Sequence, residues 1–238
     1  MRKVSELSIF FPFWNEQENI ESVIKKAIPV AQKVADKWEI IMVDDGSSDN
    51  TLGLAQKLAK QDPRLIAVPH GKNRGYGAAL KTGFAKAKYN LVVFNDGDGQ
   101  FDLSEVTKFL DKIENADMVI GYRKRRVDSP LRHLLMNMLK VWDLVLFGFH
   151  FKDIDCGFKL FKKEALNKIL PFQSEGAMIT TEILAKAKKA HLKIVQVEVN
   201  HYPRIYGNQS GGNLRVILRA VKESLMLWKD LNFNYGRN

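Results

Sequence analysis

Cysteine is nearly absent from this chain, in which Cys156 is the only one among 238 residues. A single thiol excludes a disulfide within the chain and fits a reducing compartment. Long apolar runs are also missing, because no segment reaches the roughly 20 apolar residues that span a bilayer. The nearest approach, residues 130–151, is interrupted by Arg132, Lys140 and Asp143. The apolar stretch near the N-terminus is short and lacks a small-residue cleavage site, so we expect no signal peptide and a cytoplasmic location.

Linkers rich in proline, glycine or serine are missing, and so are internal repeats. Hydrophobic residues make up 45% of the chain, which is enough for a substantial core at this length. We therefore expect residues 1–238 to form a single domain. The five histidines show no spacing typical of metal ligands, so we interpret them as structural.

Basic residues outnumber acidic ones, with 37 Lys and Arg against 27 Asp and Glu and a net charge of +10. Such an excess favours an anionic partner: nucleic acid, acidic lipid or a phosphorylated substrate. The same excess of basic residues is equally compatible with a hydrated basic surface that binds no partner. The choice among these therefore depends on the motifs.

Short apolar runs alternate with helical patterns through the first half of the chain. We expect strands near 7–12, 38–43, 65–70, 90–95 and 117–122. We expect helices near 18–37, 51–61, 75–88 and 103–115, the first of them kinked or split at Pro29. This order predicts an α/β fold with a mainly parallel sheet flanked by helices on both faces.

The pattern becomes less regular after residue 122. Beyond it we expect an amphipathic segment at 130–151, strands at 156–162 and 192–202, and helices at 163–170, 178–190 and 214–229. We interpret residues 1–122 as a nucleotide-binding half and residues 123–238 as a substrate-binding half with a C-terminal helix.

Acidic side chains follow the strand expected at 90–95. Asp96 and Asp98 flank Gly97 in "FNDGDGQFD", residues 94–102. Two carboxylates this close repel each other unless a cation lies between them. Hard divalent ions such as Mg²⁺ or Mn²⁺ prefer oxygen ligands and take some of them from phosphate and water. The loop is therefore a candidate site for a metal-bound diphosphate, and a solvated turn is the alternative.

A second acidic loop, "VDDGSSDNT" at 43–51, follows the strand expected at 38–43. Asp44 and Asp45 stand at a strand end, where a carboxylate can accept hydrogen bonds from a ribose or a base. In "GKNRGYGAALKTG", residues 71–83, the phosphate-loop pattern is missing. Gly75 and Gly77 there predict close packing of a helix whose N-terminus faces the site. Since ligands of parallel sheets bind beyond the carboxyl ends of the strands, these loops predict one shared site.

Four of these segments, in this order and at this spacing, resemble the family-2 glycosyltransferases and their GT-A fold. They are "FPFWNE", "VDDGSSDNT", "NRGYGAALKTG" and "FNDGDGQFD". The later segments "DCGFKLFKKEAL", "TTEILAKAKKA" and "VEVNHYPRIYGNQS" resemble the polyprenyl-phosphate branch, which includes dolichol-phosphate mannose synthase-like proteins. The resemblance covers roughly residues 5–215. It implies a GT-A (Rossmann-like) fold and an inverting, metal-dependent transfer of sugar from a GDP- or UDP-linked donor, with residues 123–238 binding the acceptor.

The resemblance also implies which residues bind the donor and its metal. They are Pro12, Asn15, Glu16, Asp44, Asp96, Asp98, Gln100 and Arg204. The first three would shape the nucleotide pocket, and the fourth would contact the nucleoside. The pair Asp96 and Asp98 would hold the metal and the sugar diphosphate, with Gln100 close by. Arg204 would reach the diphosphate from a loop that can close over it.

The acceptor decides whether the chemistry needs a base. A phosphate monoester is already nucleophilic at pH 7, whereas a saccharide hydroxyl needs a general base near the anomeric carbon. The resemblance places Arg123 and Arg132 where relatives grip an acceptor phosphate. Glu182 is the best candidate for a base, and it can equally hold a loop or face solvent. We therefore favour a polyprenyl phosphate over a hydroxyl acceptor in cell-surface glycan synthesis.

Two other functions are alternatives. A sugar nucleotidyltransferase needs a glycine-rich basic loop after the first strand, where this chain has "PFWNEQEN". A non-catalytic basic module would bind nucleic acid or an acidic membrane without using Asp96 or Asp98. We expect no nucleic-acid partner.

A membrane surface is an expected partner. Residues 130–151 combine basic residues with Leu, Met, Trp and Phe, a composition that suits a helix at a membrane surface or a core-facing amphipathic helix. The segment 225–228, with Leu225, Met226, Leu227 and Trp228, offers a second apolar surface or simple packing. We expect the chain to contact the cytoplasmic face of a membrane as a peripheral protein.

Overall fold

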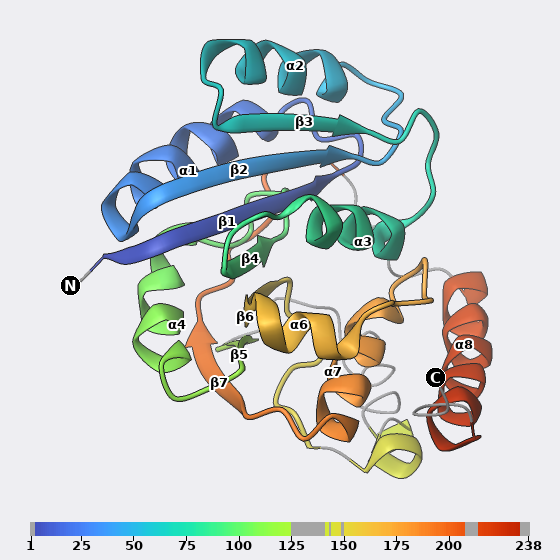
Figure 1. The fold of residues 1–238 in the computed structure, drawn as a ribbon. Helices are drawn as coiled ribbons and strands as arrows, with labels where there is room; N and C mark the ends of the chain where they lie inside the picture. The colour runs from blue at the N-terminus through green and yellow to red at the C-terminus, as the bar shows by residue number, and fades with distance from the viewer. Residues whose placement is uncertain (1–2, 125–140, 143, 149, 208–213, 234–238) are drawn as a thin grey trace.

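Seven strands pair in one sheet, in the order β3-β2-β1-β4-β6-β5-β7 (Figure 1). The structure is a computed structural model that describes residues 3–124, 141–142, 144–148, 150–207 and 214–233, without the side chains of 214–220. Four strands from the first half run parallel: β1 (Val4–Phe13), β2 (Ala35–Asp44), β3 (Leu65–Pro69) and β4 (Leu91–Asn95). Each lies where the sequence predicted a strand.

The second half of the chain extends the same sheet. β5 (Met118–Arg123) and β7 (Ile194–Val199) are parallel to each other. β6 (Phe158–Lys162) lies between β4 and β5 and runs antiparallel to both. The predicted mainly parallel sheet is confirmed. The antiparallel strand matters for the site, because its first residue pairs with the last residue of β4 and brings the segment before it beside the acidic loop.

Three helices pack on one face of the sheet: α1 (Ile20–Val34), α2 (Thr51–Gln61) and α4 (Val106–Ile113). Their apolar sides form one core with alternate residues of β1, among them Ile9 and Phe11. The neighbouring residue of the strand points the other way, as the two-residue period of a strand requires.

The opposite face is covered by α3 (Tyr76–Lys86), α6 (Lys163–Ile169), α7 (Ile179–Lys189) and α8 (Leu214–Phe233) (Figure 1). Phe10 of β1 belongs to this second core. Because both faces are covered, the strands are buried on both sides, which explains their nearly unbroken apolar sequences.

The first helix is shorter than the predicted helix at 18–37. α1 is not split at Pro29, and it ends at Val34 with β2 starting at the next residue. Pro29 lies on the exposed side of α1, where the carbonyl of Lys25 that it leaves without a donor can meet water. The helix predicted at 103–115 also differs, since it opens with a 3₁₀ turn, η1 (Leu103–Glu105).

The expected membrane-surface segment at 130–151 lies largely outside the described residues, although 141–142 and 144–147 are helical. The helix predicted at 214–229 is α8, and it reaches Phe233. Within the described parts of the chain, each helix is too short or too polar to cross a membrane.

Candidate active site

A cavity of about 640 Å³ lies where the carboxyl ends of β1, β2 and β4 meet. It unites residues from loops that are far apart in the sequence, as the edge rule for parallel sheets predicts. The predicted residues that line it are Pro12, Asn15, Glu16, Asp45, Asp96, Asp98 and Arg204. Trp14, Asn73, Tyr76 and Gly207 also line it.

Asn15 joins the loop after β1 to the acidic loop after β2. Its backbone lies in the left-handed region, with φ of 54°. Its backbone N–H donates to Oγ of Ser47 over 2.9 Å, and its side-chain oxygen accepts the backbone N–H of Ser48 over 2.8 Å. The next N–H, of Glu16, donates to Oγ1 of Thr51 over 2.8 Å. These contacts hold one wall of the cavity in a fixed shape.

Asp96 follows β4 and is held by two hydrogen bonds. Its backbone N–H donates to the carbonyl of Gly157 over 3.0 Å, and the Tyr76 hydroxyl donates to its Oδ1 over 2.7 Å. A Cβ on Gly157 would lie 1.9 Å from Oδ2 of Asp96, so a glycine is required there. Burial, and then the charge of Asp98, raise the pKa of Asp96 to about 6.

Arg204 brings positive charge to the aspartates. Its guanidinium pairs with Glu16 and lies 3.6 Å from Oδ2 of Asp98. Its Nε donates to the carbonyl of Tyr206 over 2.6 Å. The pKa of Glu16 is raised by burial, against the lowering effect of its hydrogen bond from Asn19 and of Arg204.

The loop that carries Arg204 is held by Gln100. The side-chain amide of Gln100 donates to the carbonyl of Tyr202 over 3.0 Å, and the N–H of Tyr202 donates to the Gln100 carbonyl over 2.9 Å. Asn200 is bound by Glu105 in the same way, through its backbone N–H and its side chain. These bonds end β7 at Val199, earlier than the predicted strand at 192–202.

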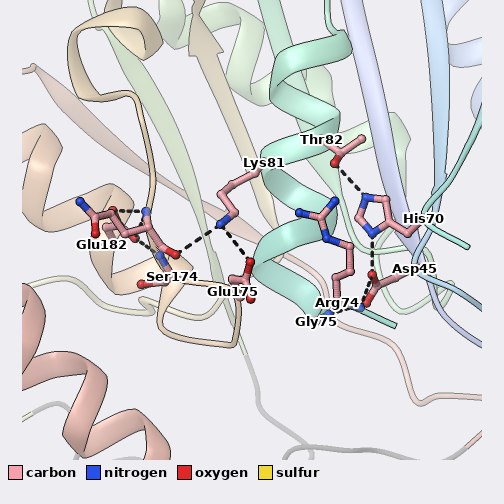
Figure 2. Close-up of polar contacts among 10 residues, drawn as sticks. Asp45, His70, Arg74, Gly75, Lys81, Thr82, Ser174, Glu175 and Glu182 are labelled. Carbon is pink, nitrogen blue, oxygen red and sulfur yellow. Dashed lines mark hydrogen bonds and ion pairs between the residues drawn. The ribbon is translucent and has the colours of Figure 1, made fainter. Parts of the chain in front are cut away.

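The two aspartates of the second acidic loop differ in their surroundings. Asp44 is buried, and its Oδ1 has no hydrogen-bond partner among the described residues. Asp45 lines the cavity, yet its carboxylate already accepts the backbone N–H groups of Arg74 and Gly75, and its Oδ1 lies 2.7 Å from Nδ1 of His70 (Figure 2). Asp45 therefore anchors the loop before α3 in addition to lining the cavity.

Of the two arginines expected at the acceptor, Arg123 lies among the described residues and is already paired. Arg123 forms a two-point ion pair with Asp153, with Nε to Oδ2 over 2.6 Å and Nη2 to Oδ1 over 2.8 Å. The pair is mostly buried, so much of the Arg123 charge is already compensated within the protein. Arg132 lies outside the described residues.

Glu182 is buried and holds a loop. Its carboxylate accepts the backbone N–H groups of Gln173 and Ser174 (Figure 2) and pairs with Lys186 over 2.7 Å. It lines a second cavity, of about 750 Å³, and it is not among the residues that line the first. This arrangement does not fit the alternative role of Glu182 as a base at the anomeric carbon.

Tyr76 and Gly157 are site residues that the sequence interpretation missed. Gly157 carried a signal, because a glycine directly before a buried strand often marks a close backbone approach. Tyr76 carried none, since the direction of its hydroxyl depends on how α3 packs against the sheet. Cys156 is buried, and burial raises the pKa of its thiol to about 12.

The fold and this cavity define the class of protein. The chain matches the crystal structure of glucosyl-3-phosphoglycerate synthase from Mycobacterium tuberculosis in complex with Mn²⁺ and UDP-glucose, with a TM-score of 0.72. The two share 22% sequence identity, over 94% of this chain and 79% of the other. The complex of the same enzyme with Mn²⁺, UDP and glucosyl-3-phosphoglycerate matches with a TM-score of 0.70. The predicted GT-A fold is thereby confirmed.

Sequence comparison then gives the family. Residues 8–170 match the family model for glycosyl transferase family 2, so the chain belongs to that family. It is 35% identical to the dolichyl-phosphate beta-glucosyltransferase of Dictyostelium discoideum, over 82% of this chain and 65% of the relative. It is 26% identical to the undecaprenyl-phosphate 4-deoxy-4-formamido-L-arabinose transferase of Proteus mirabilis, over 90% of this chain and 65% of the relative. The chain thus spans about two thirds of the length of these relatives, and the expected resemblance to the polyprenyl-phosphate branch is confirmed.

Proposed function

We propose that this chain transfers a sugar from a nucleotide-sugar to a polyprenyl phosphate, with inversion at the anomeric carbon. The observation that carries the proposal is the cavity in which the pair Asp96 and Asp98 faces Arg204. The relatives named for dolichyl and undecaprenyl phosphate support the acceptor class. In this proposal residues 1–122 bind the donor together with Arg204, and residues 123–238 otherwise bind the acceptor.

The aspartate pair fits a divalent cation, Mg²⁺ or Mn²⁺. Burial and the charge of Asp98 raise the pKa of Asp96, and the nearby charges of Lys159 and Arg123 offset this rise only in part. No group of three or more His, Cys, Asp or Glu suited to a metal lies among the described residues. Two carboxylates are enough for a cation whose other ligands are diphosphate oxygens and water. When bound, such a cation would neutralise charge that builds on the leaving diphosphate.

The loops after β1 and β2 would bind the nucleoside. Pro12, Asn15 and Glu16 line the cavity in a shape fixed by the contacts of Asn15. The unpartnered Oδ1 of Asp44 supports a contact with a donor group of the nucleoside, because a buried oxygen without a partner is costly. Asp45 would support the nucleoside-binding side of the cavity indirectly, by holding the loop at 70–75.

Arg204 would stabilise the leaving group. Its guanidinium already lies beside Asp98, and Glu16 and Tyr206 hold it in place. A planar guanidinium offers several donors at once, which suits the oxygens of a diphosphate. Gln100 would act by holding the loop that carries Arg204, since its amide is bonded to Tyr202.

The acceptor would bind as a phosphate. Its second ionisation near pH 6 leaves a nucleophilic oxygen at neutral pH, so the reaction needs no base from the protein. This agrees with the position of Glu182, which is bound within its own loop. Arg132 would then bind the phosphate. Arg123 would mainly hold its own part of the chain in place through its ion pair with Asp153.

The chain would meet this lipid at a membrane surface. Among residues 221–233 of α8, whose side chains the structure describes, Leu225, Met226, Trp228 and Phe233 are large, apolar and exposed. Lys222 and Lys229 are exposed on the same helix. Aromatic and aliphatic groups together with lysines are typical of a helix that lies at the surface of an anionic bilayer.

A donor screen tests the proposal. UDP- and GDP-linked sugars are incubated with the protein and polyprenyl phosphate, and release of nucleoside diphosphate is measured with Mn²⁺, with Mg²⁺ or with EDTA. We expect release from one donor that requires both the metal and the lipid phosphate. Release that is indifferent to the lipid, or no release from any donor, would contradict the proposal.

A further inference from the structure

We infer that Tyr76 is a positioning residue for the aspartate pair, a role that rests on the proposed function. Tyr76 is the first residue of α3 and lines the donor cavity. Its hydroxyl donates to Oδ1 of Asp96 over 2.7 Å. Asp96 and Asp98 repel each other, so without a donor the Asp96 carboxylate would rotate away from its neighbour.

The rotation of Asp96 is limited on its other side by Gly157. Oδ2 of Asp96 fills the space where a side chain on residue 157 would begin. The carboxylate therefore lies between a hydroxyl that attracts Oδ1 and a backbone that blocks Oδ2. Its orientation is set before any ligand arrives, which is what a metal ligand needs from the groups behind it.

The start of α3 is held from the sheet side by Asp45. Asp45 accepts the N–H of Arg74 over 3.0 Å and that of Gly75 over 2.8 Å. The ring of His70 links Asp45 to Thr82 on α3, with 2.7 Å to Oδ1 of Asp45 and 2.8 Å to Oγ1 of Thr82 (Figure 2). His70 and Asp45 are both nearly inaccessible to solvent, so this link is shielded from competing water.

The same turn is held from the opposite side by the loop that Glu182 orders. The N–H of Gly77 donates to the Glu175 carbonyl over 2.8 Å. A Cβ on Gly75 would lie 2.5 Å from that oxygen, and one on Gly77 would lie 2.6 Å from the Ser174 carbonyl oxygen. Lys81 adds a contact of 3.3 Å to the carbonyl of Gln173. With both sides in contact, Tyr76 has a fixed base from which to hold Asp96.

The variant Tyr76→Phe tests the inference, because it removes the hydroxyl and keeps the ring. Calorimetry measures the apparent dissociation constant of Mn²⁺ in the presence of UDP or GDP, whichever the unaltered protein binds. We expect this constant to rise by about 10-fold or more, the usual effect of losing a group that orients a metal ligand. Turnover at saturating Mn²⁺ should fall much less, and thermal unfolding without metal should be nearly unchanged.

Tyr89→Phe is the matched control, since Tyr89 contacts Lys88 through its ring face and does not line the cavity. It should leave the metal constant unchanged. The variant His70→Asn should weaken Mn²⁺ binding less than Tyr76→Phe. If His70 acts through Tyr76, the double variant should be no worse than Tyr76→Phe alone.

The outcomes separate the two levels of the argument. If the unaltered protein binds neither nucleotide in a metal-dependent way, the proposed function fails. If it does so and Tyr76→Phe binds Mn²⁺ equally well, the proposed function stands and the role of Tyr76 is wrong. Strictly additive effects of the two substitutions would show that His70 does not act through Tyr76.

Discussion

At the scale of residues, the site is defined by acids that lie close together. Asp96, Asp98 and Glu16 share one cavity, and Arg204 is the cation that touches two of them. Burial raises the pKa of both Asp96 and Glu16, so the protein holds these carboxylates in a state that favours a positive ligand.

Replacing Asp98 should remove activity. We expect Asp98→Ala to lower turnover by at least about 1000-fold, since even one lost hydrogen bond to a developing charge costs roughly 100- to 1000-fold. The measurement is nucleoside diphosphate release at saturating donor and Mn²⁺. Asp102→Asn is the control in the same loop, because an amide there can still accept the N–H of Ser104. Turnover that survives in Asp98→Ala would refute the site.

Replacing Asp96 should stabilise the protein in the absence of metal. The pKa of Asp96 is raised from 3.8 to about 6, so the folded state holds a proton that the unfolded state has released between these values. Ionisation of Asp96 therefore destabilises the folded state. This loss of stability is absent below pH 3.8 and complete above about pH 6. Asp96→Asn should raise the free energy of unfolding by up to about 3 kcal/mol at pH 7.5 and about 1 kcal/mol at pH 4.5.

Urea unfolding at both pH values in EDTA measures this gain. Addition of Mn²⁺ with the nucleotide should stabilise the unaltered protein more than the variant, because the ligand binds only the folded state. A variant that is less stable than the unaltered protein at pH 7.5 would show that the Asp96 carboxylate is not strained.

At the scale of elements, α8 has two apolar sides. Leu227 and Leu231 are buried in the core that α8 shares with α7, whereas Leu225, Met226, Trp228 and Phe233 are exposed. A helix that only packed against the domain would need the first side alone. The second side requires another explanation, and the proposed membrane contact supplies one.

Charge on the exposed side of α8 should therefore weaken membrane binding. We expect the double variant Met226→Glu with Trp228→Glu to lose most of its co-sedimentation with vesicles of phosphatidylcholine and phosphatidylglycerol. Leu170→Glu is the control, as an exposed apolar residue outside α8. Binding by the unaltered protein should fall when phosphatidylglycerol is omitted. Equal sedimentation of all three proteins would contradict the assignment of α8.

At the scale of the whole molecule, one sheet joins the half proposed to bind the donor to the half proposed to bind the acceptor. β6 lies antiparallel between β4 and β5, and it places Gly157 of the second half behind Asp96 of the first. The two halves therefore build one site across one sheet. The net charge of +10 fits a molecule whose proposed donor and acceptor both carry phosphate.

The acceptor role of Arg132 is predicted from the sequence alone. Arg132→Ala should raise the KM for polyprenyl phosphate by about 10-fold or more, the usual cost of a lost hydrogen bond to a charged group. The KM for the donor should not change. Lys124→Ala is the control, because Lys124 pairs with Glu198 over 3.1 Å on the exposed surface. An unchanged lipid KM in Arg132→Ala would remove this residue from the acceptor site.

The strand positions and the acidic loops could be predicted from the amino-acid order alone, because apolar runs and their polar ends are local patterns. That Asp44, Asp96 and Asp98 meet at one edge could also be predicted, since it follows from parallel strand order. The contacts of each side chain depend on the folded arrangement. Asp45 is bound by His70 and Glu182 by its own loop because those partners lie 25 and 9 residues away and meet them only after folding. Tyr76 depends in the same way on the packing of α3, which no local pattern records.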